Sequence, residues 1–332
     1  MKTNINNIYN NEIPQFLNDY FNYLSTIKGC SNNTIVAYTA DLSLLLKFLK
    51  MYKGLVSSGK DLQLEEITIN DLTIDILKTV KLQDLYAFMS YLEKYRGNGN
   101  YAKARKIAAI KSLFKYLTTK AKVLSMDPTL EMESPRLGKR SPVYLTLDES
   151  KTLLDATSTR HKHSIRDHSI ITLFLNCGLR LSELCSINIS DMKDDTLSIV
   201  GKGNKERTIY LNKASLRAIY KYLPIRNADI EKIHVEDKDA LFISGKYGRI
   251  NKRTVERIVK KHIGNAGLNR DKYTPHKLRH TSATLMYKHG NVDIRSLQEI
   301  LGHENISTTQ IYTHVDSDKL RTAVKSNPLS DE

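Results

Sequence analysis

The feature that most constrains the fold is a short stretch, residues 134 to 142, that separates two halves of different character. It reads Ser-Pro-Arg-Leu-Gly-Lys-Arg-Ser-Pro and shows no apolar periodicity. Prolines and glycines at this density interrupt regular secondary structure. A chain of 332 residues is also long enough to bury two hydrophobic cores. We therefore expect two domains, at residues 10–121 and 144–328, joined by a linker at 122–143.

The first half has the pattern of a helical bundle. From about residue 12 to residue 119, apolar side chains recur at helical spacing. Ser31 or Asn33 can cap a helix that begins at Thr34. A later helix, residues 101–117, carries an apolar stripe and, apart from it, a basic stripe. This stripe could face DNA phosphates or simply water, and it consists of Lys103, Arg105, Lys106 and Lys111.

The second half predicts mixed secondary structure. A Thr146-Leu-Asp-Glu149 capping box starts a helix. Three short β-prone runs follow, at residues 196–200, 207–211 and 240–243, and they predict a small antiparallel sheet. The helical period then returns after Arg253. The fold class is therefore mainly α, with a helical N-terminal domain and a mixed α/β C-terminal domain.

The charge of the chain points to a polyanionic partner. There are 51 Lys and Arg against 36 Asp and Glu, a net charge of +15 and a pI near 9.5. Both halves are basic, as the two jaws of a DNA clamp would be, although a generally basic protein would give the same count. The three cysteines show no disulfide or zinc spacing, and we find no signal peptide or membrane-length apolar run. We expect a soluble, cytoplasmic protein.

The end of the second half carries groups suited to a phosphate. Pro275 predicts a helix start, which places His276 and Arg279 one turn apart near its N–H groups. Gly302 can end a later helix so that His303 emerges at the corner, and a second capping box starts a short helix that carries Tyr312. Forming the phenolate of a tyrosine at pH 7 costs about 4 kcal/mol, so a nucleophilic tyrosine needs such neighbours. Alone, Tyr312 would be an ordinary half-buried aromatic residue.

Two earlier motifs add cations. In Gly-Leu-Arg180-Leu-Ser-Glu183-Leu, the carboxylate lies one helical turn from the arginine and could hold its guanidinium as a fork for two phosphate oxygens. The pair could equally be a structural salt bridge. The turn Gly201-Lys202-Gly-Asn-Lys-Glu-Arg207 lifts Lys202 toward a ligand, although its spacing is not that of a Walker A loop.

In this order, the motifs resemble those of the tyrosine site-specific recombinases, the phage integrase family, and most closely its Xer-like branch. The motif-bearing match runs from about Thr146 to Val315, and residues 31–42 are similar to the family's core-binding domain. The resemblance implies a SAM-like helical core-binding domain followed by a catalytic domain with the DNA breaking-rejoining fold. One departure is the polar, acidic-leaning segment 54–81, which is longer than in the compact Xer pattern.

The resemblance also implies roles for the residues. Tyr312 would be the nucleophile that forms a 3′-phosphotyrosine on DNA. The activating residues would be Arg180, Lys202, His276, Arg279 and His303, with Glu183 in support. Of these, the two arginines would grip the scissile phosphate, Lys202 would protonate the leaving 5′ oxygen, and His276 would be the base or proton relay. Residues that would contact DNA are Asn33, Thr34, Lys103, Arg105, Lys106 and Lys111.

By the same resemblance, the partner is a double-stranded recombination site, bound by a homotetramer or by a heterotetramer with a paralogue. We expect no cofactor, and the histidines near residues 161–168 indicate a basic loop more strongly than a metal site. The expected process is dimer resolution, integration or inversion. The alternatives are a type IB topoisomerase and a basic DNA-binding protein that does not cut. The segment 316–329 resembles a helix that docks on a neighbouring protomer, or it packs within its own chain.

Overall fold

The computed structural model describes residues 12–56, 63–138, 142–157, 162–201, 206–290, 292–303, 305–310 and 312. The chain divides into two compact units, Met1–Lys139 and Arg140–Glu332. Each unit has its own buried core, and each is described by itself below.

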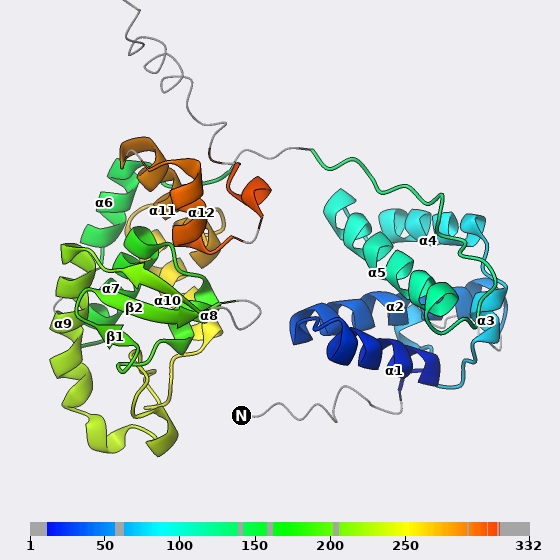
Figure 1. Cartoon of the computed structure of the whole chain (residues 1–332), viewed down its shortest axis with the longest axis horizontal. Helices are drawn as coiled ribbons and strands as arrows, with labels where there is room; N and C mark the ends of the chain where they lie inside the picture. The colour runs from blue at the N-terminus through cyan, green and yellow to red at the C-terminus, as the bar shows by residue number, and fades with distance from the viewer. Residues whose placement is uncertain are drawn as a thin grey trace, which may run out of the picture. The chain divides into compact units, whose positions relative to one another are not determined.

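The N-terminal unit is built from helices (Figure 1). Its elements are α1 (Gln15–Asn22), the π-helix η2 (Tyr23–Ile27), α2 (Asn32–Tyr52), the 3-10 turn η3 (Leu64–Glu66), α3 (Asp75–Lys78), α4 (Leu82–Lys94) and α5 (Asn100–Thr119). Helix α2 contacts α4 and α5. Four of its leucines are fully buried together with Phe88 of α4 and Phe114 of α5, so the predicted helical bundle has a continuous apolar core.

The start of α2 follows the local sequence. Ser31 is the N-cap residue, and its hydroxyl accepts a hydrogen bond from the backbone N–H of Thr34 at 3.3 Å. This bond satisfies one of the free donors at the helix start. Of the two caps that the sequence predicts, Ser31 is the one used.

The described part of the long segment after α2, from residue 63 to residue 81, packs onto the same core. Its apolar side chains Ile67, Ile69 and Leu77 are buried. Lys50 of α2 holds the segment, because its ammonium donates to Asp71 at 2.7 Å and to the carbonyl of Thr68 at 2.9 Å. The segment is thus part of the N-terminal unit's structure.

The C-terminal unit surrounds one central helix. Its helices are α6 (Leu147–Asp155), α7 (Lys162–Cys177), α8 (Leu181–Ser186), α9 (Lys213–Asn227), α10 (Lys252–Asn265), α11 (Pro275–His289) and α12 (Ile294–Leu301), with short 3-10 turns η5 (Ile230–Lys232), η6 (Val235–Asp237) and η7 (Ile306–Thr308). Helix α7 contacts α6, α9, α10 and α11. Its Ile170, Ile171 and Phe174 have no exposed surface, and each such burial contributes about 1.5–3 kcal/mol. The core therefore fixes α11, which carries part of the candidate site.

The sheet has three antiparallel strands in the order β1-β2-β3. These are β1 (Met192–Lys193), β2 (Thr196–Val200) and β3 (Glu206–Tyr210), with Leu197 opposite Ile209 in the β2–β3 register. Figure 1 shows the strands running across the middle of the unit in this view. Two of the predicted strands are confirmed by β2 and β3.

The prediction of a strand at 240–243 is wrong. That segment makes only isolated bridges, from Ala240 to Asn188 and from Ile243 to Arg249. Two of its backbone groups bind side chains of α9 instead of a neighbouring strand. Arg226 donates to the carbonyl of Ala240 at 3.0 Å, and the phenol of Tyr222 accepts from the N–H of Ile243 at 3.2 Å. The β-prone residues are therefore buried beneath a helix rather than paired in the sheet.

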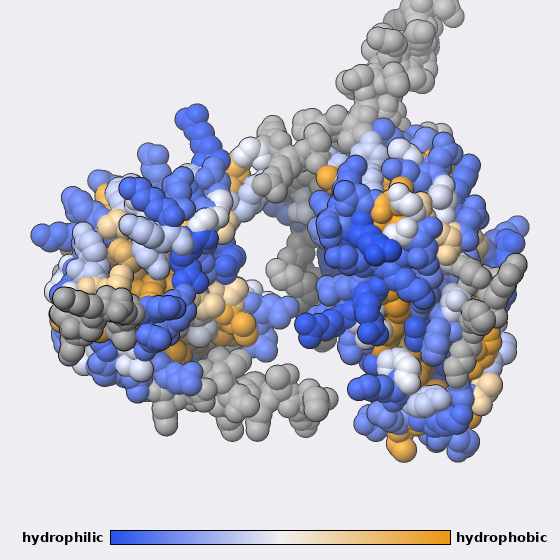
Figure 2. Space-filling model, turned by 180° about the vertical axis from the view of Figure 1, so that it is seen from behind, coloured by the Kyte–Doolittle hydropathy of each residue, from blue (hydrophilic) through white to orange (hydrophobic). Residues whose placement is uncertain are grey.

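The face shown in Figure 2 is mostly hydrophilic, with separate apolar patches on both units. Within the described residues, no helix combines the length and apolarity needed to cross a membrane.

Candidate active site

Arg180 is fixed by the residues around the start of α8. Glu183 accepts from the backbone N–H of Arg180 and from its Nη1, both at 2.7 Å. Gly178 precedes this pair with φ of +59°, and a Cβ there would lie 2.9 Å from Cδ2 of Leu301. A glycine is therefore required for the chain to turn into α8 against the end of α12. The predicted pair of Arg180 and Glu183 is present.

A second arginine holds the same carboxylate. Arg207 of β3 donates from Nη1 and Nη2 to the two carboxylate oxygens of Glu183, at 2.7 and 3.0 Å. Burial alone would raise the pKa of Glu183, but the bonds from Arg207 and Arg180 outweigh it and hold this pKa at about 2. Glu183 is thus a buried carboxylate that stays charged, and it ties the β hairpin to α8.

Arg279 lies one turn inside α11 and is 3% exposed. Its Nη1 and Nη2 donate to the carbonyls of Gly178 and Leu301, each at 2.6 Å. Burial, together with the neighbouring cation Arg180, lowers the pKa of Arg279 to about 10. The guanidinium therefore remains charged at neutral pH, beside a carboxylate oxygen of Glu183 at 3.8 Å.

The end of α12 completes this cluster. Gly302 has φ of +62°, and its carbonyl accepts from Nη2 of Arg180 at 2.6 Å. His303 emerges at the corner, as predicted, and its Nδ1 lies 3.0 Å from the hydroxyl of Thr309. Burial, reinforced by Arg279 and Arg180, lowers the pKa of His303 to about 4. Its imidazole is therefore neutral at pH 7 in this state.

Tyr312 is buried against His280 of α11, which in turn contacts His276. Its phenol oxygen lies 2.6 Å from Nδ1 of His280, and Nε2 of His280 lies 3.1 Å from Nε2 of His276. The side chain is only 1% exposed. Burial raises its pKa to about 12, although Arg279 acts in the opposite direction. The expectation that the neighbours favour the phenolate does not hold in this state, because loss of hydration outweighs their charge.

The predicted short helix at Tyr312 is present as tight 3-10 turns. The N–H of Thr309 donates to the carbonyl of Ile306 at 2.8 Å, and that of Tyr312 donates to the carbonyl of Thr309 at 3.0 Å. These turns bring the phenol back against α11.

An open cavity of about 630 Å³ lies over the arginines and histidines. Its described lining consists of Leu179, Arg180, Leu181, Ser182, Lys252, Glu256, Thr274, Pro275, His276, Arg279, His303 and Thr308. Hydrogen bonds to Glu183 and Gly302 use two of the five side-chain N–H donors of Arg180, so others remain for an anion. The cavity therefore presents fixed cations and neutral imidazoles to a ligand, which suits a phosphate diester.

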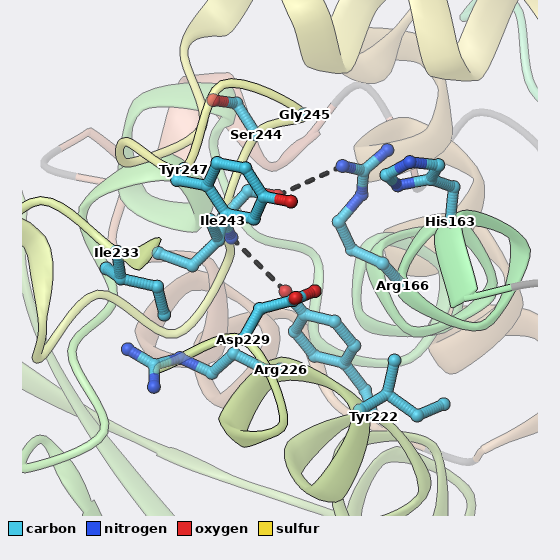
Figure 3. Close-up of a pocket in the computed structure, with 11 residues that line it drawn as sticks. His163, Arg166, Tyr222, Arg226, Asp229, Ile233, Ile243, Ser244, Gly245 and Tyr247 are labelled. Atoms are coloured by element: carbon cyan, nitrogen blue, oxygen red, sulfur yellow. Dashed lines mark hydrogen bonds between the residues drawn. The ribbon is translucent and has the colours of Figure 1, made fainter. Parts of the chain in front are cut away.

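A second cavity, of about 140 Å³, is drawn in Figure 3. Arg166 and Arg226 line it, but both act as structural donors. Arg166 donates to Asp167 at 2.7 Å and to the carbonyl of Ile243 at 3.0 Å, and Arg226 donates to the carbonyls of Ala240 and Lys238. This cavity is separate from the cluster around Glu183.

The structure brings together Arg180, Glu183, His276, Arg279, His303 and Tyr312. Lys202 lies outside the described residues, as does the segment 316–329. The sequence patterns did not predict two contacts, that of Arg207 with Glu183 and that of His280 with Tyr312. Arg207 ends the Gly201–Arg207 turn and His280 directly follows Arg279, but their partners lie far along the chain and depend on the fold.

One residue of the predicted basic stripe on α5 is not exposed. Lys106 is buried, and its ammonium pairs with Asp41 at 2.6 Å, so it does not belong to an exposed stripe. Arg105 pairs with the other oxygen of Asp41 while its side chain stays 47% exposed. Lys103 pairs with Glu93, and Lys111 is half-buried. A buried cation needs a buried anion, and Asp41 on α2 provides it.

The other two residues expected to contact DNA lie at the start of α2. Asn33 is exposed, and Thr34 is half-buried with its hydroxyl 2.9 Å from that of Ser31.

Comparisons with known proteins agree with this architecture. The family described as "Phage integrase family" matches residues 143–319, and "Phage integrase, N-terminal SAM-like domain" matches residues 17–121. The chain is 54% identical to tyrosine recombinase XerC of Caldanaerobacter subterraneus, over 96% of this chain and 88% of that one. It is 30% identical to tyrosine recombinase XerD of Listeria monocytogenes, over 93% and 97%. The crystal structure of XerH bound to a palindromic difH substrate superposes with a TM-score of 0.69, at 23% identity over 93% and 84%.

Replacing Glu183 by Gln tests the electrostatic centre of the cluster. Because the pKa of Glu183 is depressed from 4.5 to about 2, its contribution to stability is complete above pH 4.5 and is lost as the pH falls toward 2. We expect Glu183→Gln to lower the free energy of unfolding by about 3 kcal/mol at pH 7, measured by urea titration. The difference from wild type should shrink steadily between pH 5 and pH 3.

Asp271→Asn is a matched control, because Asp271 pairs with Lys260 at 2.8 Å on the exposed surface. It should leave the free energy of unfolding close to that of wild type at pH 7 and across the range from pH 5 to pH 3. If the loss of unfolding free energy in Glu183→Gln did not change with pH, it would contradict the assignment of Glu183 as a charged carboxylate that stabilises the fold.

Proposed function

This chain belongs to the phage integrase family of tyrosine recombinases, and from that premise we propose how its described site divides the work of cutting and rejoining DNA. The activity itself is site-specific DNA recombination of the Xer type, by strand cleavage and rejoining. The proposal concerns which residue does what. One observation carries the proposal. Arg180, Arg279 and Glu183 come together at the cavity, and the phenol of Tyr312 contacts His280.

Arg180 and Arg279 bind the nonbridging oxygens of the scissile phosphate. Both guanidinium groups are held before substrate arrives, Arg180 by Glu183 and Gly302, and Arg279 by Gly178 and Leu301. Donors fixed in this way stabilise charge that develops in the transition state without reorganising. His303 adds a neutral donor at the same cavity.

Tyr312 is the nucleophile. Its phenol oxygen attacks the phosphorus in line with the 5′ oxygen, the bond to that oxygen breaks, and a 3′-phosphotyrosine forms. Lys202 supplies the proton that the leaving 5′ oxygen needs, and His276 serves on the side of the nucleophile as base or relay. The energy of the broken phosphodiester is retained in the new ester, so rejoining requires no nucleotide cofactor. The 5′ hydroxyl of a partner strand reverses the step on the ester.

Four protomers act together on two DNA sites. Exchange between two duplexes requires four strands to be cut, and each protomer has one nucleophile. The assembly is a homotetramer, or a heterotetramer with a paralogue. The assembly binds duplex DNA through basic side chains of both units, among them Lys111 and Arg105 on α5, and through the polar side chain of Asn33 at the start of α2.

Tyr312→Phe tests the nucleophile. On a nicked suicide substrate, wild type should accumulate a covalent DNA complex that resists denaturant, and the Phe variant should form none, because its ring has no oxygen to attack phosphorus. Denaturing gel electrophoresis measures the product. Tyr287→Phe, on α11, is a control that should retain the complex. An adduct in Tyr312→Phe would show that another residue is the nucleophile.

Lys202→Ala tests the acid. A substrate with sulfur in place of the bridging 5′ oxygen has a leaving group that needs little protonation, so it should restore most of the rate that the variant loses on ordinary DNA. Single-turnover cleavage measures both rates. Lys205→Ala is the matched control from the same turn. If sulfur rescued Lys205→Ala instead, Lys205 would be the acid.

Mapping covalent complexes in cells tests the biological process. We propose dimer resolution, which acts between two copies of one site, so the complexes should concentrate at a single short sequence in the chromosome or a plasmid. Sequencing of DNA bound to Tyr312 after denaturation locates them. Complexes at the ends of a mobile element, or at inverted repeats, would instead indicate integration or inversion.

A further inference from the structure

His280 lies between the proposed nucleophile and the histidine that the family motif brings to the cavity. The ring of His280 contacts the rings of both. The rings of His276 and His280 meet edge to face with centroids 4.5 Å apart, and those of His280 and Tyr312 are 5.7 Å apart. Their polar atoms form a chain from the Tyr312 phenol through Nδ1 and Nε2 of His280 to Nε2 of His276. His276 lines the cavity, so the chain leads from the buried phenol to the proposed phosphate site.

With the phenol of Tyr312 as the donor, one arrangement of protons satisfies both hydrogen bonds. The phenol of Tyr312 is buried and protonated, and a buried hydroxyl donates where an acceptor is available. Its described acceptor is Nδ1 of His280. A neutral imidazole that accepts at one nitrogen carries its proton on the other, so Nε2 of His280 donates to Nε2 of His276. The proton of His276 is then on Nδ1.

We propose that His280 takes the proton of Tyr312 during DNA cleavage and passes its own Nε2 proton to His276. This deepens the proposed function and rests on it. As the bond from the phenol oxygen to phosphorus forms, the O–H bond breaks and that proton moves to Nδ1 of His280. The Nε2 proton moves to Nε2 of His276, which becomes an imidazolium. Lys202 delivers a separate proton to the departing 5′ oxygen, so one proton leaves the nucleophile and one reaches the leaving group.

Without DNA, the charges of the site oppose this transfer. Burial, together with His276, Lys277 and Arg279, lowers the pKa of His280 to about 4, and the pKa of His276 is also lowered, first by burial. A phosphate diester in the cavity brings a negative charge beside the same arginines, which favours the imidazolium form. Bonding to phosphorus also makes the phenol oxygen more acidic. The nucleophile is therefore activated only when its substrate is in place.

His280→Asn separates proton transfer from simple contact. The Asn side-chain oxygen can reach the position of Nδ1 and accept from Tyr312, but an amide cannot take up a proton at neutral pH. We expect the single-turnover rate of covalent complex formation to fall about 10²- to 10³-fold, with DNA affinity within twofold of wild type. His289→Asn, an exposed histidine at the end of the same helix, should react at the wild-type rate.

Two further measurements decide the role. The substrate with bridging sulfur should leave His280→Asn slow, because the defect concerns the nucleophile. A fluorotyrosine at position 312, whose phenol is more acidic, should restore much of the rate in the Asn background. A variant that was slow only because its fold was damaged would not gain from that substitution.

Three outcomes would overturn the inference. If His280→Asn formed the covalent complex at the wild-type rate or faster, the contact of His280 with Tyr312 would only hold the phenol in its buried position. Rescue by bridging sulfur would place His280 on the leaving-group side, and failure of the fluorotyrosine would exclude proton transfer as the defect. Tyr312→Phe keeps the two proposals apart. If it still formed the adduct, the proposed nucleophile would fail, whereas a normal rate for His280→Asn with an inactive Phe variant would refute the relay alone.

Discussion

One buried carboxylate organises the candidate site. Glu183 is 2% exposed, yet it binds Arg180 and Arg207 and lies 3.8 Å from Arg279. Three cations at this distance would repel one another, and a buried charge without a partner would destabilise the fold by several kcal/mol. The carboxylate offsets both effects. Because its partners come from α8, β3 and α11, it also joins three elements that are distant in the sequence.

The family motifs allowed the site residues to be anticipated because each motif stands at a helix end or a turn. Pro275 starts α11 and Gly302 ends α12 in the left-handed region, so His276, Arg279 and His303 could be placed from local rules. The contacts of His280 and Arg207 could not, since they join residues 32 and 24 positions apart. Such pairings depend on how helices and hairpins pack, which no local pattern encodes.

The fold shows the same division between local and distant information. Helices with clear caps, such as α2 and α6, could be predicted from Ser31 and Thr146. The run at 240–243 has the composition of a strand, but Arg226 and Tyr222 of α9 occupy two of its backbone groups. Lys106 belongs to a basic stripe by spacing, but Asp41 turns it inward. In both cases a tertiary contact overrides the structure that the local sequence pattern predicts.

The two arginines that line the cavity, Arg180 and Arg279, are held largely by the main chain. Arg279 is bound by the carbonyls of residues 178 and 301, and Arg180 by that of residue 302. Every amino acid supplies a carbonyl, so the side chains around these anchors can change during evolution while the guanidinium positions persist. The glycines at 178 and 302 are the exceptions, because their backbone turns leave no space for a Cβ. A recombinase built in this way can diverge in the DNA sequence it recognises without rebuilding the chemistry that cuts it.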